Sequence, residues 1–414
     1  MAPLRVCYAV WPAEVVKWDQ FNHLRVCNLH AFKKEDWDDL LLSPHFDIYV
    51  INFEGLTYVR QEVDTGLLTR IKPSHGFDLL VIDESTKVKD TQTQRFKALR
   101  PKLPAFKRRM ILTGTPIPNG LQDLFGQMFV VDLGASLGKY VTHFRMEFCI
   151  QDPSGFGWNL RRGADEMIYR RVANNLMRLD AVDNLEMPEL IHNTINVSLP
   201  TRGLRSAYKE LEEKFYTEME NNPIAVANPA AVGMKLRQMA NGFIYDDDGG
   251  MKKRETHWLH DEKIDALEEL VDSLQGRPLL LAYEFEADAE AIMKRFDGGK
   301  LPMAVDMGKS KNPAQTIKHF NAGNIPLLIA HPASAGHGLN LQDNCHDVGF
   351  YGITWNREFY DQFIARVWRQ GQKNPFVMVH SIVCQGTKDE QVVQVLNAKG
   401  LTQKKFNDHI KAKK

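Results

Sequence analysis

Short, almost continuously apolar runs alternate with amphipathic stretches in the first third of the chain and again in its last third. Residues 77–83 (FDLLVID) and 279–285 (LLLAYEF) are two such runs. Runs of this kind are typical of strands buried on both faces, and strands that alternate with helices form a mostly parallel sheet covered by helices. The sequence therefore predicts an α/β fold with two parallel-sheet lobes.

The middle of the chain has a different pattern. Residues 131–257 contain helical patterns such as DEMIYRRVANNLMRL and RGLRSAYKELEEKFYTEMEN, and few signals of buried strands. We therefore predict a first lobe at 1–130, a largely helical segment at 131–257, and a second lobe at 258–414 that ends in a basic tail. The strands predicted on either side are residues 45–53, 77–83 and 108–114, and then RPLLLAYEF, KLPMAVDM, IPLLIAHP, HDVGFYGITW and PFVMVHSIV.

Composition excludes few functions. The 414 residues are 43% hydrophobic and 25% charged, as in an ordinary globular protein, and 52 basic residues balance 52 acidic ones. This balance argues against a polycation but allows a local basic groove for nucleic acid. The five cysteines are scattered without a CxxC pair, so zinc is not expected and a reducing, cytoplasmic setting is favoured. We see no secretory signal and no apolar run of about 18 residues, so no membrane partner is expected.

Two adjacent carboxylates end the first of these apolar runs, where the sequence reads VIDES at 81–85. Parallel α/β sheets bind ligands at the carboxyl ends of their strands. We expect Asp83 to hold Mg²⁺ through its water shell and Glu84 to polarise an attacking water, as at the metal end of an ATPase site. A solvated acidic strand end is the alternative, and the two residues alone do not decide between them.

A further apolar run ends in small hydroxyl and glycine residues, ILTGTP at 111–116. Thr113, Gly114 and Thr115 would let the backbone approach a phosphate or a neighbouring acidic loop closely. A plain strand-to-turn transition punctuated by prolines is the alternative for this segment.

The segment QFIARVWRQGQ at 362–372 places Gln362, Arg366 and Arg369 at positions i, i+4 and i+7. If the segment is helical, the three side chains share one face. Two arginines on one face can bind a γ-phosphate as arginine fingers. A solvated, salt-bridged helix face is the alternative.

Two glycines follow a predicted strand in HPASAGHGLNLQD at 331–343. Gly336 and Gly338 suit a loop that approaches a phosphate or a nucleic-acid backbone, because glycine allows close approach of the main chain. Glycines after a strand are also common in plain turns.

In this order the segments resemble the conserved motifs of the SWI/SNF-like branch of superfamily-two helicases and DNA translocases, particularly its compact phage and bacterial members. The resemblance covers nearly the whole chain. It is most specific in LTGTP, which follows VIDES, and in QFIARVWRQGQ. The correspondences are VIDES with motif II, LTGTP (112–116) with motif III, ASAGHGLNLQ (333–342) with motif V, QFIARVWRQGQ with motif VI, APLRVCYAVWPAEVVKW (2–18) with motif Ia, VINFEGL (50–56) with motif Ib, LLLAYEF with motif IV, and KLRQMANGFIY (235–245) with the segment before the second lobe.

The resemblance implies two RecA-like lobes that use ATP and Mg²⁺ to move on double-stranded DNA. Asp83 and Glu84 would act on metal and water, and Arg366 and Arg369 would reach the same nucleotide from the second lobe. Other residues that it implicates are Gln362, Gly336, Gly338, Thr113, Gly114 and Thr115 for the nucleotide, and Trp11, Trp18, Asn52 and Asn340 for DNA. The two tryptophans fit a place in the core equally well.

A phosphate-binding loop of the form GxxxxGK[ST] is not found in the 414 residues. Members of the family carry it before motif Ia, where this sequence starts, so we expect the first lobe to be incomplete. The triplet Gly308-Lys309-Ser310 is a decoy, because Met303 stands where the first glycine of the loop belongs. Without the lysine and the amides of such a loop, hydrolysis would be slower by orders of magnitude.

Three interpretations therefore stay open. The chain is an ATP-driven DNA translocase, a hydrolysis-deficient remnant that binds DNA, or one half of a split ATPase whose P-loop is on another polypeptide. ATP hydrolysis by the pure chain supports the first interpretation. DNA binding whose affinity does not change with nucleotide supports the second. ATP hydrolysis that requires a second polypeptide supports the third.

Overall fold

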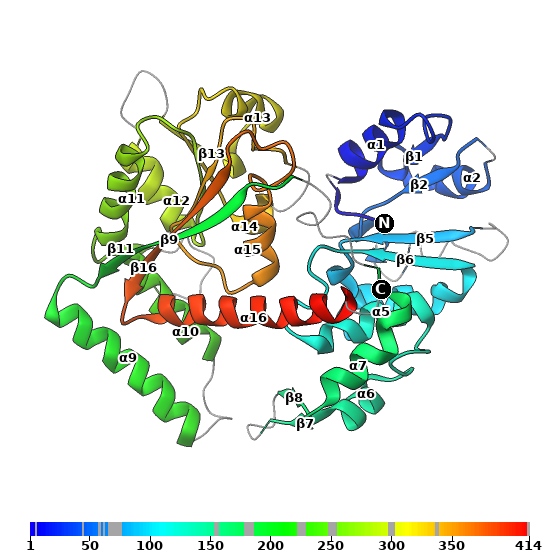
Figure 1. The fold of residues 1–414 in the computed structure, drawn as a ribbon, viewed down its shortest axis with the longest axis horizontal. Coiled ribbons are helices and arrows are strands. Elements are labelled where there is room, and N and C mark those ends of the chain that lie inside the picture. The colour runs from blue at the N-terminus through cyan, green and yellow to red at the C-terminus, as the bar shows by residue number, and fades with distance from the viewer. Residues whose placement is uncertain are drawn as a thin grey trace. The chain divides into compact units, whose positions relative to one another are not determined.

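The computed structural model divides into two units, each with its own hydrophobic cores. Unit 1 is Met1–Arg178 with Leu401–Lys414, and unit 2 is Leu179–Gly400 (Figure 1). The residues that the structure describes are 1–4, 6–43, 45–56, 59–60, 63–64, 77–152, 157–177, 186–221, 229–246, 255–296, 303–335 and 339–411. In this part of the chain, no helix is both long and apolar enough to cross a membrane.

Unit 2 is built on a six-stranded sheet in which all neighbouring strands are parallel, in the order β13-β14-β12-β15-β16-β9. Every residue of β12, β14 and β15 is buried. The predicted α/β class with a parallel sheet is therefore confirmed for this unit. The strands are β9 (Glu189–Ser198), β12 (Leu279–Ala282), β13 (Ala304–Asp306), β14 (Leu327–Ala330), β15 (Asp347–Phe350) and β16 (Phe376–Gln385).

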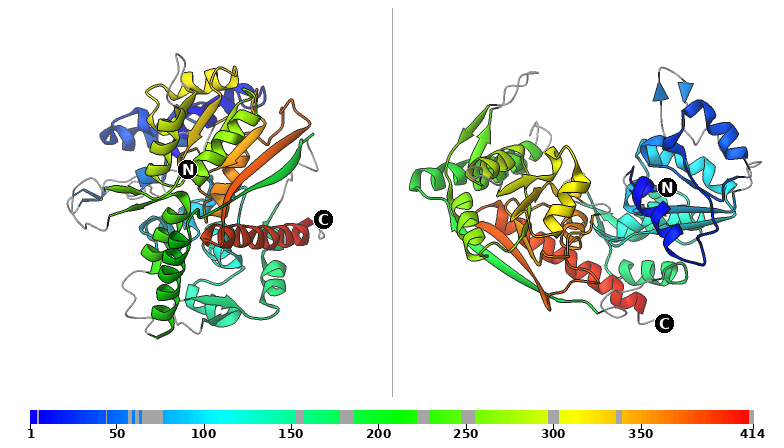
Figure 2. Two further views of the ribbon diagram at one scale, coloured as in Figure 1. Left: turned by 90° about the vertical axis from the view of Figure 1, so that its left-hand side faces the viewer. Right: turned by 90° about the horizontal axis from the view of Figure 1, so that it is seen from above.

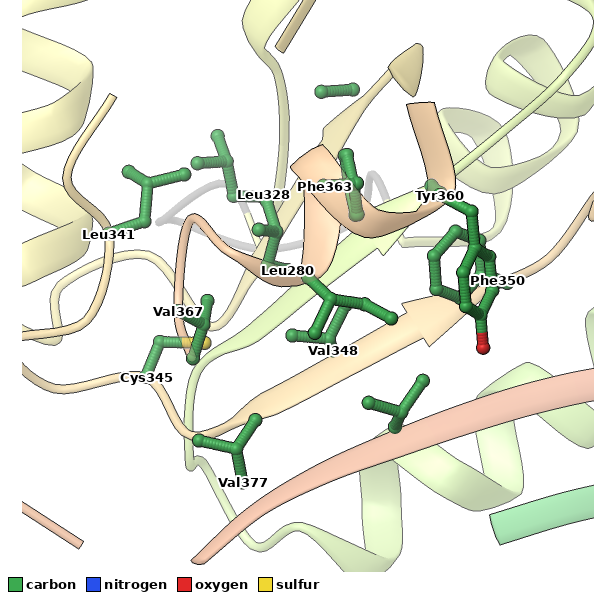
Figure 3. Packing of buried hydrophobic residues seen from close by; sticks show 14 of the residues in the cluster. Leu280, Leu328, Leu341, Cys345, Val348, Phe350, Tyr360, Phe363, Val367 and Val377 are labelled. Carbon is green, nitrogen blue, oxygen red and sulfur yellow. The ribbon is translucent and has the colours of Figure 1, made fainter. Parts of the chain in front are cut away.

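Helices cover both faces of this sheet, as the apolar strands predict. Leu280 of β12 lies in a core with side chains of α13, α15 and α16, whereas Leu279 and Leu281 lie in a second core with α11 and α12. In the first core the rings of Phe350 and Tyr360 stack with their centroids 4.5 Å apart (Figure 3). The helices are α11 (Glu262–Ser273), α12 (Glu286–Phe296), α13 (Pro313–Asn321), α14 (Pro332–Ala335), α15 (Arg357–Ile364) and α16 (Lys388–Lys411), whose residues from Leu401 belong to unit 1.

The sequence analysis did not predict β9, which pairs with β16 along all ten of its residues (Figure 1, Figure 2). This strand comes from the segment 131–257, which was expected to be largely helical. It is the last strand of the sheet, and its residues alternate between half-buried and exposed along most of its length. An edge strand needs no continuous apolar run, so the signal used for the other strands is missing from its sequence.

The described rest of the middle segment in unit 2 is mainly helical. Tyr208, Leu236 and Met239 bury the apolar sides of two helices against each other. A short antiparallel pair of strands follows them. These elements are α9 (Arg202–Asn221), α10 (Pro229–Asn241), β10 (Phe243–Tyr245) and β11 (Thr256–Trp258).

Unit 1 contains two parallel strand pairs, β1 with β2 and β5 with β6. In β5, Leu80 and Ile82 point into a core that also holds Phe96 and Phe129, and Asp83 ends the strand. The elements are α1 (Trp11–Lys17), β1 (Val26–Asn28), α2 (Trp37–Leu42), β2 (Ile48–Val50), β3 (Val59–Arg60), β4 (Val63–Asp64), β5 (Leu79–Asp83), α4 (Gln94–Leu99), β6 (Arg108–Leu112), α5 (Leu124–Asp132), α6 (Val141–Phe148), β7 (Cys149–Gln151), β8 (Trp158–Leu160) and α7 (Ala164–Val172).

A buried lysine joins three elements of unit 2. Lys263 is fully buried, and its Nζ lies 2.5 Å from Oδ2 of Asp389 at the start of α16. The same ammonium donates to Oδ1 of Asn241 at 2.7 Å and to the carbonyl of Tyr351 at 3.2 Å. All three donors of the ammonium are thus used, which is what a buried charge requires.

Replacing Lys263 with methionine should destabilise the fold by about 3–5 kcal/mol, because the carboxylate of Asp389 stays buried without its partner. Urea denaturation measures the effect as a lower midpoint. Lys294→Met, at an exposed position of α12, is the matched control and should leave the midpoint nearly unchanged. The double variant Lys263→Met with Asp389→Leu should recover much of the stability. Equal midpoints for wild type and Lys263→Met would contradict the assigned role of this pair.

Candidate functional site

Asp83 stands at the carboxyl end of β5 with both carboxylate oxygens engaged. Its Oδ2 accepts a hydrogen bond from Nε1 of Trp11 at 3.2 Å, and its Oδ1 accepts one from the backbone N–H of Glu84 at 3.0 Å. The backbone of Met1 lies along the same strand, where its carbonyl accepts from the N–H of Asp83 and its amine donates to the carbonyl of Val81. The carboxylate is therefore held in a fixed orientation.

Burial raises the pKa of Asp83, and the nearby carboxylate of Glu84 raises it further. The hydrogen bonds from Trp11 and from the Glu84 amide oppose this rise. A carboxylate in such a place gains from a bound cation, because a positive charge stabilises its ionised form. The described part of unit 1 thus presents a carboxylate whose environment suits a divalent metal ion.

Glu84 adopts a left-handed backbone conformation, with φ 57° and ψ 57°. For a residue with a side chain, such a conformation costs of order 1–3 kcal/mol, and it persists where the surrounding structure imposes it. Here the chain turns from β5 directly into a 3₁₀ helix at Ser85–Val88. Strain of this kind clusters at functional sites, so the conformation of Glu84 supports a role for this pair of carboxylates.

The threonines and glycine of ILTGTP follow the end of β6, the strand next to β5. Residue Asp83 is in register with Leu112, so both loops leave the sheet at the same edge. The N–H of Thr115 donates to Oγ1 of Thr113 at 3.2 Å. A Cβ added at Gly114 would meet no atom within 4 Å, so no neighbour in the structure requires a glycine there.

Gln127 of α5 connects these two loops and was missed in the sequence analysis. The side chain is fully buried. Its Oε1 accepts from Oγ of Ser85 at 2.7 Å, and its Nε2 donates to the carbonyls of Pro116 at 2.6 Å and Asp123 at 2.8 Å. A polar residue inside the apolar run LFGQMFVV was the available signal, because a buried amide needs hydrogen-bond partners.

Replacing Trp11 with phenylalanine should raise the pKa of Asp83, because the variant lacks the N–H that stabilises the ionised carboxylate. At a pH near this pKa, a smaller fraction of Asp83 is then ionised. Carbon-13 NMR of labelled aspartate side chains measures the titration. Trp18→Phe is the matched control, since Nε1 of Trp18 donates to Glu14 and not to Asp83. A lower or unchanged pKa in Trp11→Phe would contradict the prediction.

Ser85→Ala and Gln127→Leu should show strongly non-additive effects on the free energy of unfolding. Gln127→Leu leaves buried polar groups without partners and should cost about 2 kcal/mol or more. Once the glutamine is gone, removing the Ser85 hydroxyl should cost nothing further and should recover part of the stability. A double-mutant cycle by urea denaturation measures this coupling, expected at about 1 kcal/mol. Additive effects would show that the two side chains do not act together.

In unit 2 the prediction that Gln362, Arg366 and Arg369 share one helical face is wrong. Helix α15 ends at Ile364, and the chain continues in turns through both arginines. Nε of Arg366 donates to the carbonyl of Gln362 at 2.9 Å, so the guanidinium satisfies a carbonyl at the end of the helix. The backbone N–H of Arg366 donates instead to the carbonyl of Phe363 at 3.1 Å, so the α-helical hydrogen-bond pattern does not continue through Arg366.

Both arginines contact motif V. Nη1 of Arg366 donates to the carbonyl of Leu339 at 3.3 Å, and the N–H of Leu341 donates to the carbonyl of Arg366 at 3.1 Å. Nη1 of Arg369 donates to Oδ1 of Asn340. The structure thus brings together two predicted arginines and the predicted asparagine, whereas Gly336 and Gly338 lie outside the described residues.

The other residues singled out in the sequence, Trp18, Asn52 and Gly308, take no part in the hydrogen bonds described above for the end of β5 and for the two arginines. Trp18 follows α1 and is 50% exposed. Asn52 is buried, where its Oδ1 accepts from the N–H of Gly55 at 2.8 Å and shapes the loop after β2. Gly308 donates its N–H to Oδ1 of Asp306 in a turn before α13.

Two family descriptions match the chain. The SNF2-related domain matches residues 1–242, and the helicase conserved C-terminal domain matches residues 262–371. Together they contain both carboxylates of the strand end and both arginines. The chain belongs to the SNF2-related family of helicases.

The chain is similar to proteins of phages, bacteria and eukaryotes. "Putative protein p41" of Acyrthosiphon pisum secondary endosymbiont phage 1 is 34% identical over 427 residues, with 100% of this chain and 88% of that protein covered. "Protein CHROMATIN REMODELING 25" of Arabidopsis thaliana is 24% identical, and the chain spans 46% of its length. Among solved structures, the SWI2/SNF2 ATPase core of Sulfolobus solfataricus in complex with dsDNA is 22% identical, with a TM-score of 0.39 and coverage of 97% of this chain and 80% of that one.

Proposed function

We propose that the chain is an ATP-dependent DNA translocase that couples ATP hydrolysis to movement on double-stranded DNA. The observation that carries the proposal is the pair Asp83–Glu84 at the end of β5, with Glu84 in a left-handed conformation. Membership of the SNF2-related family supports it.

The residues at this strand end fit Mg²⁺, because Mg²⁺ prefers carboxylate oxygens and is bound through one or two of them together with substrate phosphates. Burial and the Glu84 carboxylate raise the pKa of Asp83, so a divalent cation would stabilise its ionised form. When bound, ATP would supply the phosphoryl group, and Mg²⁺ would neutralise part of the negative charge on its phosphates. Asp83 would hold the metal, Glu84 would orient and deprotonate water, and Thr113, Gly114 and Thr115 would border the nucleotide.

Residues of unit 2 have proposed roles in the same reaction. Arg366 and Arg369 would stabilise negative charge on the transferred phosphate, and Gln362 would contact the nucleotide. Asn340 would bind a DNA phosphate, in keeping with its place on the exposed part of motif V. Contacts to phosphates position a protein on DNA without reading its sequence.

A second candidate is a DNA-binding protein that hydrolyses ATP poorly or only with another polypeptide. It is favoured by one observation, that GxxxxGK[ST] does not occur in the 414 residues. The lysine and amides of that loop stabilise the transferred phosphate in P-loop ATPases, so hydrolysis is expected to be slow. An assay of this chain therefore needs enzyme in excess over ATP.

The pure chain should release phosphate from ATP faster when duplex DNA is added. Glu84→Gln should lower this rate about 10²- to 10⁴-fold, because it removes the group that accepts the proton of water. Glu35→Gln, at an exposed position of unit 1, is the matched control and should leave the rate unchanged. Single-turnover measurement with labelled ATP provides the rate.

Three results would contradict the proposal. If the chain binds DNA with an affinity that nucleotide does not change, and does not hydrolyse ATP, the DNA-binding candidate is favoured. Hydrolysis that appears only with a second polypeptide would favour the split enzyme. Equal rates for wild type and Glu84→Gln would show that this carboxylate has no part in the reaction.

A further inference from the structure

A hollow of about 250 Å³ opens in unit 1 beside α4, α5 and the start of α6. Three of the residues that line it are basic: Lys97, Arg100 and Lys139. None of its lining residues is acidic. The hollow is separate from the strand end at Asp83, which does not line it. Basic side chains that converge on a concave surface raise the local positive potential and attract anions.

These three cations have no carboxylate partner among the described residues, in contrast to neighbours such as Lys89 and Arg95, which form ion pairs with Asp123 and Glu54. Like charges that gather without counter-charges repel each other. A bound anion would remove this repulsion. No carboxylate of the described residues therefore competes with an anion for these three side chains.

Arg100 is fixed in its place by packing. Its guanidinium carbon lies 4.7 Å from the ring centroid of Phe129 and 5.6 Å from that of Tyr140, and its Nη2 donates to the carbonyl of Lys139 at 2.8 Å. A guanidinium has five N–H donors, and stacking on aromatic rings leaves its edge available for a ligand. This arrangement holds the arginine and the backbone of Lys139 at the hollow before any ligand binds.

Two further features of the hollow add to the attraction for an anion. Val141 and Thr142, the first residues of α6, line it, and Tyr140 at the N-cap makes no side-chain cap hydrogen bond. The backbone N–H groups at a helix start favour negative charge. Thr91 lines the hollow as well, and a threonine hydroxyl can donate a hydrogen bond.

We propose that Lys97, Arg100 and Lys139 form a phosphate site that binds the backbone of duplex DNA. Lysine, arginine, hydroxyl groups and helix starts are the groups that proteins use to contact DNA phosphates. The hollow is smaller than the roughly 300–1,000 Å³ of pockets that enclose a small molecule, so it suits one phosphate of a polymer better than a whole nucleotide. The site lies outside the segments expected to contact DNA, and it rests on the proposed function only in taking DNA as the ligand.

The double variant Lys97→Gln with Lys139→Gln tests the site, with Arg100 kept because it packs on aromatic rings. Duplex-DNA affinity is measured across a series of salt concentrations. For each phosphate that the variant no longer binds, the slope of log affinity against log salt should become less steep by about 1, which corresponds to about eightfold weaker binding at 0.1 M salt. Lys107→Gln is the matched control: this lysine is exposed, pairs with Asp78 and does not line the hollow. It should leave the slope unchanged.

Mass spectrometry of lysine acetylation is an independent readout. Duplex DNA should protect Lys97 and Lys139 in the wild-type chain. If the wild-type chain binds duplex DNA and its slope of log affinity against log salt equals that of the double variant, this inference is overturned and the proposed function is not. Wild type that does not bind duplex DNA would overturn the proposed function and this site together. Protection by inorganic phosphate, ATP or single-stranded DNA, but not by duplex DNA, would also overturn the inference.

Discussion

The parallel pairing of β5 with β6 is the constraint on which the candidate site of unit 1 depends. Neighbouring parallel strands end at one edge of a sheet, and Asp83 is in register with Leu112. Side chains alternate between the faces of a strand, so Ile82 is fully buried while Asp83 is on the other face. A shift of one residue would bury the carboxylate in the apolar core and expose the isoleucine, at a cost that fixes the register.

Hydrogen bonds then fix the conformations of the loops that follow these two strands. Gln127 binds Ser85 and the carbonyl of Pro116, so the loop after β5 and the loop after β6 share one buried amide. Trp11 supplies an N–H to the carboxylate of Asp83. The strained backbone of Glu84 lies between these fixed points, which explains how a left-handed conformation persists at a residue with a side chain.

Sequence patterns predicted the parts of the fold that depend on burial. The strands β12 and β14 are buried at every residue and appear in the sequence as continuous apolar runs. The edge strand β9 was not predicted, because it is only partly buried. The carboxylates at the end of β5 were predicted from their place after an apolar run. Gln127 was not: the apolar run around it could have signalled a buried amide, but Ser85 and Pro116, which it binds, lie in other segments of the sequence.

The end of α15 was also not predicted from the local sequence, and Arg366 of motif VI has an additional structural role there. Arg366 donates through Nε to the carbonyl of Gln362 and through Nη1 to that of Leu339, so it satisfies a helix end and orients the loop of motif V. Lysine presents its three donors from a single nitrogen at the end of a flexible stem, whereas the guanidinium carries donors on separate nitrogens, and here Nε and Nη1 reach two different carbonyls. The geometry of unit 2 alone therefore favours arginine at this position, before any contact with phosphate is considered.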